Sequence, residues 1–239
     1  MAETIFITGS TRGIGKAVAE QAANEGFTVI LHGREKTQKS EAFANSLGVE
    51  IYYFDISNED MVNRECQKIL KRYPTLKSII NCAGTVTPQS YTNFTFDNWS
   101  NHFMINVMGI INVVNAMSDN LDPHGSIVNI ASVRGVHGMA SDRVPAYSAS
   151  KAALISVTET MAKHFSPGIR VNAVSPSFTL TDMSKSWDKS TVEKTKNNLL
   201  KRAAEPSEIS NIAIFLASDA SSHITGQNII ADGGYSVRD

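Results

Sequence analysis

The sequence lacks most of the features that mark several common protein classes. It has two cysteines among 239 residues, which excludes a disulfide scaffold and suggests a reducing compartment. Lys and Arg number 22 and Asp and Glu number 23, so no basic excess indicates a nucleic-acid partner. No apolar run approaches the roughly 20 residues that cross a membrane, and no basic segment precedes the first apolar run. We therefore expect a cytoplasmic protein with no membrane anchor and no secretion signal.

What is present is the composition of a globular protein. Hydrophobic residues make up 42% and charged residues 19% of the chain. No repeat, low-complexity tract or linker divides the sequence, so residues 1–239 are predicted to form one domain. No metal site is expected, because these histidines lack the spacing of metal ligands: His102, His124, His137, His164 and His223.

Short apolar runs alternate with longer amphipathic segments along the whole chain. Strands are expected over 4–8, 27–31, 50–54, 76–81, 126–130, 169–174 and 227–231. Helices are expected over 13–24, 37–47, 59–72, 96–117, 147–165 and 206–216. The alternation predicts an α/β fold, a doubly wound parallel sheet of about seven strands with helices on both faces. Residues 178–205 break this rhythm and are predicted to form a lid of loop and one or two short helices.

A glycine-rich turn joins the first predicted strand to the first predicted helix. Glycine permits a tight turn and lets the backbone approach a pyrophosphate closely. The start of the helix then offers free N–H groups and the positive end of its dipole to the phosphates. The sequence therefore predicts a dinucleotide site made by Gly9, Ser10, Thr11, Arg12, Gly13, Ile14 and Gly15.

The end of the second predicted strand indicates which dinucleotide is bound. An acidic residue there would bind the ribose 2′-hydroxyl of NAD, but this chain has Gly33 followed by Arg34. An arginine can bind a 2′-phosphate with two hydrogen bonds, and Arg12 could assist. The pattern favours NADP, while Glu35 keeps NAD possible.

Tyr147 and Lys151 are four residues apart on a predicted helix, so both side chains lie on one face. A cationic lysine beside a phenol favours the phenolate and lowers the pKa of the tyrosine. The tyrosine can then act as a general acid or base. Ser132, at the end of a predicted strand, and Asn106, on the preceding helix, complete a candidate catalytic set.

Together these segments resemble the short-chain dehydrogenase/reductase family over essentially the whole chain. The resemblance implies a Rossmann fold and hydride transfer between a nicotinamide cofactor and a ketone or secondary alcohol. The segments that carry it are 8–15, Asp55-Ile56, 81–84, Asn106, Ser132, 147–151, 172–176 and 232–234.

The resemblance also implies roles for the four candidate catalytic residues. Tyr147 would be the general acid in reduction and the base in oxidation. Lys151 would lower the pKa of Tyr147 and hold the nicotinamide ribose. Ser132 would hydrogen-bond the substrate carbonyl. Asn106 would hold a water molecule that links Lys151 to solvent.

Further cofactor contacts follow from the same resemblance. Asp55 would meet the adenine amino group, Asn81 would support the cofactor near the adenosine ribose, and Thr181 would contact the nicotinamide carboxamide or a phosphate. The remaining contacts are expected from Ile56, Ala83, Gly84, Pro176, Ser177 and Thr179. Many members have glycine where this chain has Ser177, so the backbone approach to the nicotinamide is expected to differ slightly.

Within the family the chain is most similar to the 3-oxoacyl-[acyl-carrier-protein] reductase group, although the shared segments also occur in sugar, steroid and small-alcohol members. Docking of an acidic carrier protein needs basic residues, whereas Asp119 and Asp122 precede the fifth strand. Acyl thioesters, small ketones, sugars and cyclic alcohols therefore stay open as substrates. Besides Ser132 and Tyr147, substrate contacts are expected from Val133, His137, Met183 and Trp187.

Two other functions are possible for a chain with this pattern. It could be a nucleotide-sensing protein that lost turnover, or a structural subunit of a larger assembly. The complete set of candidate catalytic residues argues against the first, and the intact glycine turn argues against the second. The resemblance further implies a homotetramer in which the helices over 96–117 and 147–165 meet a neighbouring subunit.

Overall fold

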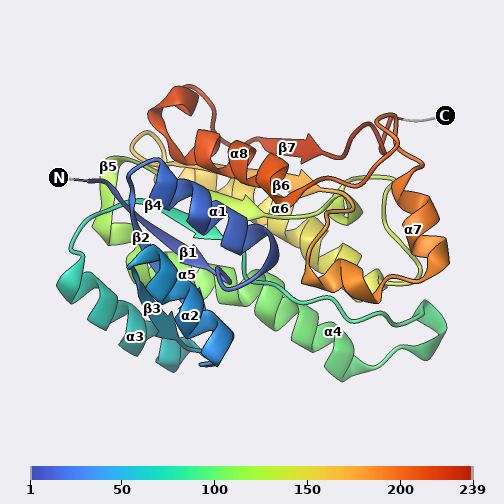
Figure 1. The fold of residues 1–239 in the computed structure, drawn as a ribbon, viewed down its shortest axis with the longest axis horizontal. Helices are drawn as coiled ribbons and strands as arrows, with labels where there is room; N and C mark the ends of the chain where they lie inside the picture. The colour runs from blue at the N-terminus through green and yellow to red at the C-terminus, as the bar shows by residue number, and fades with distance from the viewer. Residues whose placement is uncertain (1, 238–239) are drawn as a thin grey trace.

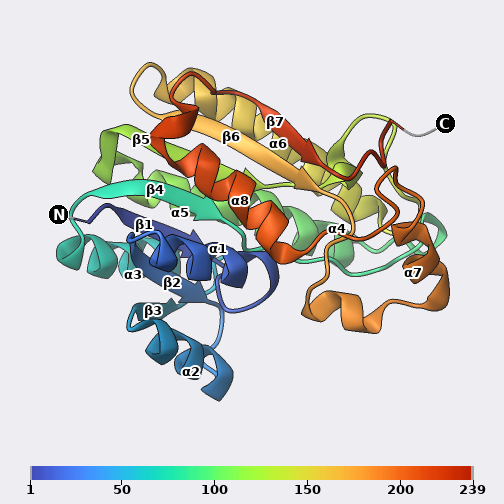
Figure 2. The same cartoon turned by 45° about the horizontal axis from the view of Figure 1, so that its top comes forward.

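A single sheet of seven parallel strands organises the protein. The structure, a computed structural model, describes residues 2–237 apart from the side chains of Met183 and Ser186. The strands pair in the order β3-β2-β1-β4-β5-β6-β7, which Figure 2 shows from bottom to top. They are β1 (Thr4–Thr8), β2 (Thr28–Gly33), β3 (Glu50–Tyr53), β4 (Leu76–Asn81), β5 (Leu121–Ile130), β6 (Arg170–Pro176) and β7 (Asn228–Ala231). This architecture confirms the predicted fold class.

Helices cover both faces of the sheet, because successive strand residues point to opposite sides. Ile5 and Ile7 of β1 pack with α1 (Gly13–Asn24), α2 (Gln38–Leu47) and α8 (Pro206–Ala217) on one face. Phe6 packs with α3 (Glu59–Arg72), α5 (Gly109–Met117) and α6 (Pro145–Phe165) on the other. Figure 1 shows α1 and α8 in front of the strands and α6 behind them. Two buried faces explain why the strands are apolar without alternation.

The helix predicted over residues 96–117 contains a local change of winding. It consists of α4 (Phe96–Phe103), a π-helical turn η2 (Met104–Met108) and α5. The Thr95 hydroxyl caps its start by accepting the N–H of Asn98 at 3.3 Å. Asn106 lies inside the π turn and is fully buried. Such turns often occur at functional sites because they redirect side chains without ending the helix.

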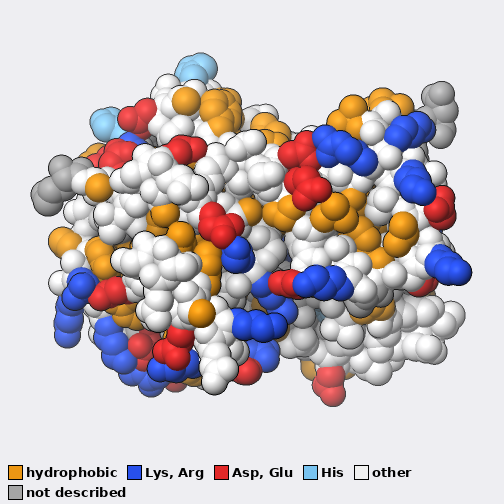
Figure 3. Space-filling view, viewed as in Figure 1, with side chains coloured by type: hydrophobic (Ala, Val, Ile, Leu, Met, Phe, Trp, Pro, Cys, Tyr) orange, Lys and Arg blue, Asp and Glu red, His pale blue; other side chains and the backbone are white. Residues whose placement is uncertain are grey.

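The lid, residues 178–205, lies beyond the carboxyl ends of the strands (Figure 1). It holds a 3₁₀ turn η5 (Asp182–Ser186) and the short helix α7 (Lys189–Thr195). Its two ends are tied together, since Ala204 N–H donates to Phe178 O and Leu180 N–H donates to Ala204 O, both at 2.9 Å. Hydrophobic side chains gather on its surface (Figure 3), among them Leu180, Val192, Leu199 and Leu200. Shorter 3₁₀ turns are η1 (Tyr91–Asn93), η3 (Ser118–Asn120), η4 (Val133–Gly135) and η6 (Asp219–Ser221).

His32, which the sequence analysis did not single out, holds the ends of three neighbouring strands together. Its Nδ1 accepts the N–H of Gly9 at 3.1 Å, so the proton sits on Nε2, which donates to Phe54 O at 2.9 Å. The imidazole also packs against the Phe54 ring, with centroids 4.3 Å apart. Burial lowers the pKa of His32 to about 4. The glycine turn after β1 is therefore fixed to β2 and β3 by a neutral histidine.

We expect this histidine to make the protein less stable as the pH falls from 6.5 to 4. The unfolded chain takes up a proton near the ordinary pKa of 6.5, whereas the folded chain takes it up only near 4. Protonation therefore favours the unfolded state in this window. The free energy of unfolding should fall by up to about 1.4 kcal/mol for each pH unit. Urea unfolding at several pH values measures this slope.

His32→Gln is the matched variant, because its side-chain carbonyl can accept the Gly9 N–H but does not titrate. Contributions from carboxylates cancel when the two proteins are compared. The parent should lose more stability than the variant between pH 6.5 and 4. Equal slopes would show that His32 is not the group responsible.

Candidate active site

The glycine turn packs directly against the residues that follow β4. Gly9 has a φ of +62°, and a Cβ there would lie 2.7 Å from Ala83 Cα. A Cβ at Gly15 would collide with the carbonyl oxygen of Gly9. Ala83 N–H donates to the Thr8 hydroxyl at 3.1 Å, which joins the ends of β1 and β4. Glycine is thus required at both positions for close backbone packing.

The start of α1 fits the pyrophosphate of a dinucleotide. α1 begins at Gly13 and the Arg12 side chain makes no capping hydrogen bond to it. Lys16 N–H is the first to bond back to Arg12 O, so the N–H groups of the first turn have no partner within the helix. Thr181 Cγ2 lies 3.3 Å from where a Cβ of Gly13 would stand, which places the lid across this turn. Bare N–H donors at a helix start are the groups that bind phosphate.

One basic residue adjoins the predicted ribose-binding position, and others act on the lid. Gly33 is buried, and a Cβ there would lie 3.1 Å from Thr11 Cγ2. Arg34 is exposed and pairs with Glu35 at 2.9 Å, a contact that solvent weakens. The pKa of Asp182 in the lid is lowered by Lys185, then by Lys39 and Arg12. Lys39, at the start of α2, was not predicted from the sequence, because nothing local links it to the glycine turn.

Ser132, Tyr147 and Lys151 lie together beyond the end of β5. The Ser132 hydroxyl lies close enough to the Tyr147 phenol to lower its pKa, and it accepts the N–H of Arg134 at 3.1 Å. Lys151 Nζ lies 5.9 Å from the centre of the Tyr147 ring and donates to Ile130 O at 2.7 Å. The four-residue spacing on α6 thus places both side chains beside the serine.

Asn106 connects this cluster to the chain after β4. Its Oδ1 accepts the N–H of Thr85 at 2.8 Å, and its Nδ2 donates to Thr85 O and to Ser150 Oγ, both at 3.0 Å. Oδ1 and Lys151 Nζ would lie 3.2 and 3.5 Å from a Cβ of Gly84. The structure therefore brings all four predicted catalytic residues into one cluster. The water-holding role of Asn106 stays a prediction.

Burial shifts the pKa values of the tyrosine and the lysine in opposite directions. Burial lowers the pKa of Lys151 to about 8. Burial also raises the pKa of Tyr147, while the Ser132 hydrogen bond and the positive charge of Arg134 lower it. The net pKa of Tyr147 is raised, and the lowering by Lys151 stays a prediction. Both net shifts have one cause, because desolvation disfavours the phenolate of Tyr147 and the ammonium of Lys151 alike.

The other predicted cofactor residues occupy several different environments. Asp55 Oδ1 accepts both the N–H and the hydroxyl of Ser57, at 2.9 and 2.6 Å. Ile56 is buried against Gly109 of α5. Pro176 ends β6, and Thr179 is buried where the lid begins. Direct contact of these residues with a cofactor stays a prediction.

The predicted substrate residues are spread over two segments. Val133 is buried and His137 is exposed. Trp187, at the end of η5, packs edge-on against Phe178, with ring centroids 5.6 Å apart. The side chain of Met183 lies outside the described part of the structure. Substrate contact of these four residues stays a prediction.

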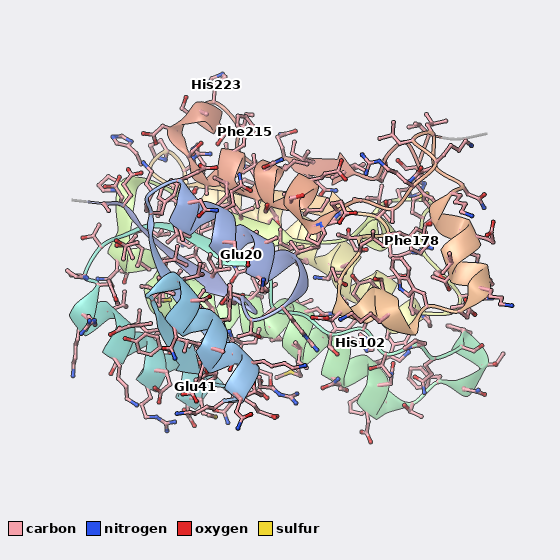
Figure 4. All side chains as sticks on the ribbon, in the orientation of Figure 1. Glu20, Glu41, His102, Phe178, Phe215 and His223 are labelled. Carbon is pink, nitrogen blue, oxygen red and sulfur yellow. The ribbon has the colours of Figure 1, made fainter. Side chains whose placement is uncertain are left out.

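Aromatic residues beside the lid were missed by the sequence analysis. Phe178 and Tyr235 pack edge-on at 5.6 Å, and the guanidinium of Arg134 lies against both rings. His102 is fully buried, and its ring meets the edge of Tyr147 at 6.4 Å. Figure 4 shows Phe178 and His102 at the same end of the molecule. One feature of the sequence could have pointed to Arg134: it lies two residues after Ser132.

Within residues 2–237 no three His, Cys, Asp or Glu side chains gather as metal ligands would. None of the described helices combines the length and the apolar character needed to cross a bilayer.

Comparison with known proteins gives consistent matches over the whole chain. A family model described as enoyl-(acyl carrier protein) reductase matches residues 9–236. The 3-oxoacyl-[acyl-carrier-protein] reductase FabG of Chlamydia trachomatis is 34% identical over 97% of this chain and 96% of its own. A protein named NAD-dependent glycerol dehydrogenase from Listeria innocua is 33% identical over 97% and 93%. The structure of a gluconate 5-dehydrogenase from Burkholderia cenocepacia, in complex with NADP and tartrate, superposes with a TM-score of 0.91 at 26% identity, covering 99% and 96%.

These matches span the glycine turn, the Ser132–Tyr147–Lys151 cluster and the last strand. They agree with a doubly wound sheet whose candidate site lies at the carboxyl ends of its strands. The chain belongs to the short-chain dehydrogenase/reductase family and is an NAD(P)-dependent oxidoreductase that acts on alcohol and carbonyl groups.

Proposed function

We propose that the protein uses NADPH to reduce the keto group of a 3-oxoacyl compound or a related small ketone. The observation that carries this proposal is the grouping of Ser132 and Tyr147, with Lys151 beside them, at the loop after β4 that packs on the glycine turn. Hydroxyl donors grouped in this way suit a carbonyl oxygen that gains negative charge. The 34% identity to a FabG reductase supports the 3-oxoacyl class.

Each of the four residues has a defined task in this reaction. The bound nicotinamide supplies or accepts the hydride. Ser132 and Tyr147 donate hydrogen bonds to the carbonyl oxygen, and Tyr147 transfers its proton to that oxygen as charge develops. Lys151 holds the nicotinamide ribose, and its pKa of about 8 lets it exchange a proton near neutral pH. Asn106 fixes the loop after β4 beside Lys151 and holds the proton route open.

A second candidate function is the oxidation of a sugar, a sugar acid or another small alcohol. The relative named glycerol dehydrogenase and the gluconate 5-dehydrogenase structure both support it. Asp119 in η3 and Asp122 near the start of β5 also disfavour docking of an acidic carrier protein, because like charges repel. Asp122 accepts the N–H of His124. A nucleotide sensor without turnover is disfavoured, because all four predicted catalytic side chains lie together.

A turnover assay with Tyr147→Phe tests the proposed chemistry. NADPH oxidation should be seen with acetoacetyl-CoA, an acetoacetyl carrier protein or a small ketone. The substitution removes the transferable proton, so turnover should fall by at least roughly 10²–10⁴-fold, while NADPH binding followed by fluorescence is retained. Tyr73→Phe, at the end of α3, is the control and should keep activity. NADPH binding by the parent without turnover of any carbonyl would favour a sensor instead.

We propose that Arg34 makes the enzyme prefer NADP. Gly33 leaves no carboxylate to repel a 2′-phosphate, and Arg34 can exchange its exposed partner Glu35 for the phosphate. A charged hydrogen bond is worth about 1.5–3 kcal/mol, or roughly ten- to a hundredfold in affinity. Arg34→Ala should weaken NADPH binding by that factor and leave NADH binding almost unchanged.

Titration of both cofactors measures this effect. Lys36→Ala is the control, because it removes an exposed positive charge two residues away that pairs with Glu41. Equal weakening of NADPH and NADH, or a parent that prefers NADH, would show that Glu35 or another group sets the preference.

We propose that the protein works as a homotetramer in the cytoplasm, where its two free cysteines stay reduced. The π turn exposes Met104 by 43% and Met108 by 41%, so an apolar strip faces outward beside α6. Exposed apolar strips often mark subunit interfaces. Light scattering at micromolar concentration should give four times the 26.0 kDa chain mass. Met104→Glu should lower that mass, whereas Val192→Glu on α7 should not; a parent mass of one chain would refute the assembly.

A further inference from the structure

Arg134 lies beside the reacting groups but has no role in the chemistry proposed above. It belongs to η4, directly after β5, and its backbone N–H donates to the Ser132 hydroxyl at 3.1 Å. Its charge is also one of the two influences that lower the pKa of Tyr147. Arg134 is thus joined to the reacting serine through its backbone and acts on the phenol through its charge.

Contacts from three separate segments hold the Arg134 side chain in one position. The guanidinium carbon lies 5.8 Å from the centre of the Phe178 ring and 5.6 Å from that of Tyr235. Nη1 donates to Met139 O at 3.2 Å, and Nη2 contacts the Tyr235 hydroxyl at 3.5 Å. Phe178 begins the lid after β6, and Tyr235 follows β7. A cation fixed in this way is preorganised for a ligand.

The positive charge of Arg134 is not balanced by a carboxylate in the described part of the chain. Arg34 and Arg202, which are exposed, each form an ion pair with a glutamate. Arg134 is half-buried, and within residues 2–237 no Asp or Glu oxygen lies within ion-pair distance of it. A partly desolvated cation without a counter-ion is costly, and aromatic faces offset only part of that cost. Its two hydrogen bonds also leave three of its five N–H donors for another partner.

We propose that Arg134 binds a carboxylate of the substrate, so that the preferred substrate is a keto or hydroxy acid. A carboxylate matches the planar fork of a guanidinium and accepts two parallel hydrogen bonds from it. The Phe178 ring, which lies against Arg134, also packs edge-on against Trp187, so apolar surface adjoins the guanidinium. The carbonyl is then held by Ser132 and Tyr147 and the acid by Arg134. This inference rests on the proposed reduction at Ser132 and Tyr147, and it selects free acids over esters.

Pairs of substrates that differ only in this charge provide the test. The probes are 2-oxobutanoate, 3-oxobutanoate and 4-oxopentanoate, each beside its methyl ester, with NADPH and NADH. The series moves the carboxylate away from the carbonyl by one carbon at a time. It therefore covers a range of separations between the group bound by Arg134 and the group bound by Ser132 and Tyr147. For at least one pair, kcat/KM of the acid should exceed that of the ester by about ten- to a hundredfold, the worth of a charged hydrogen bond.

Variants at Arg134 assign the preference to this side chain. Arg134→Gln should raise KM for the preferred acid by about the same ten- to hundredfold and leave the ester nearly unchanged. Arg134→Lys keeps the charge but lacks the planar fork, so its KM for the acid should lie between that of the parent and that of Arg134→Gln. Arg143→Gln, an exposed arginine in the same loop, is the control and should keep the acid-to-ester ratio of the parent. Circular dichroism and NADPH affinity confirm that each variant is folded.

Two outcomes would overturn the inference, and they are distinguishable. If the parent reduces acids and esters equally, or Arg134→Gln slows both to the same extent, Arg134 acts on Tyr147 alone and the proposed reduction stands. If the parent turns over no acid, ester, thioester or small ketone with either cofactor, the proposed function itself fails, and the inference fails with it.

Discussion

The parallel pairing of β1, β4, β5 and β6 is the constraint on which the site depends. Parallel strands end at the same edge of a sheet, about 4.8 Å apart. The residues that follow each strand therefore meet, although long stretches of sequence separate them. Gly9 follows β1, Ala83 follows β4, Ser132 follows β5 and Ser177 follows β6. The cofactor-binding turn and the reacting hydroxyls are thus neighbours as a direct result of strand order.

Buried polar groups keep this edge in register. Asn81 Nδ2 donates to Asn129 Oδ1, and Asn129 Nδ2 donates to Thr158 Oγ1, both at 2.9 Å, which links β4 to β5 and α6. His32 does the same for β1, β2 and β3. A buried donor or acceptor left without its partner costs about 1–3 kcal/mol. These side chains therefore resist relative movement of the strand ends that carry the site.

Desolvation decides the proton chemistry of the site. The same burial that holds Tyr147 and Lys151 in place opposes charge on both, raising one pKa and lowering the other. The charge of Arg134 counteracts the effect of burial on the pKa of Tyr147, because a cation favours the phenolate. When Arg134 is paired with a substrate carboxylate, that influence is reduced and Tyr147 holds its proton more firmly. Substrate binding and the acidity of the proton donor are then coupled through one side chain.

Features that depend on local pattern can be predicted from the order of residues alone. The alternation of apolar runs and amphipathic segments predicted the doubly wound sheet, and the glycine turn before α1 is visible in residues 8–15. The spacing of Tyr147 and Lys151 fixed their common face, because a helix repeats every 3.6 residues. The sequence did not reveal the π turn around Asn106, since backbone winding there depends on what the helix packs against.

Contacts between distant segments depend on the complete fold. His32 meets Gly9 and Phe54, and Arg134 meets Phe178 and Tyr235, without any local signal that pairs them. The raised pKa of Tyr147 likewise has no local signal, because spacing along a helix does not show how deeply a side chain is buried. Desolvation and long-range packing are properties of the whole fold, and the order of residues along the chain does not display them.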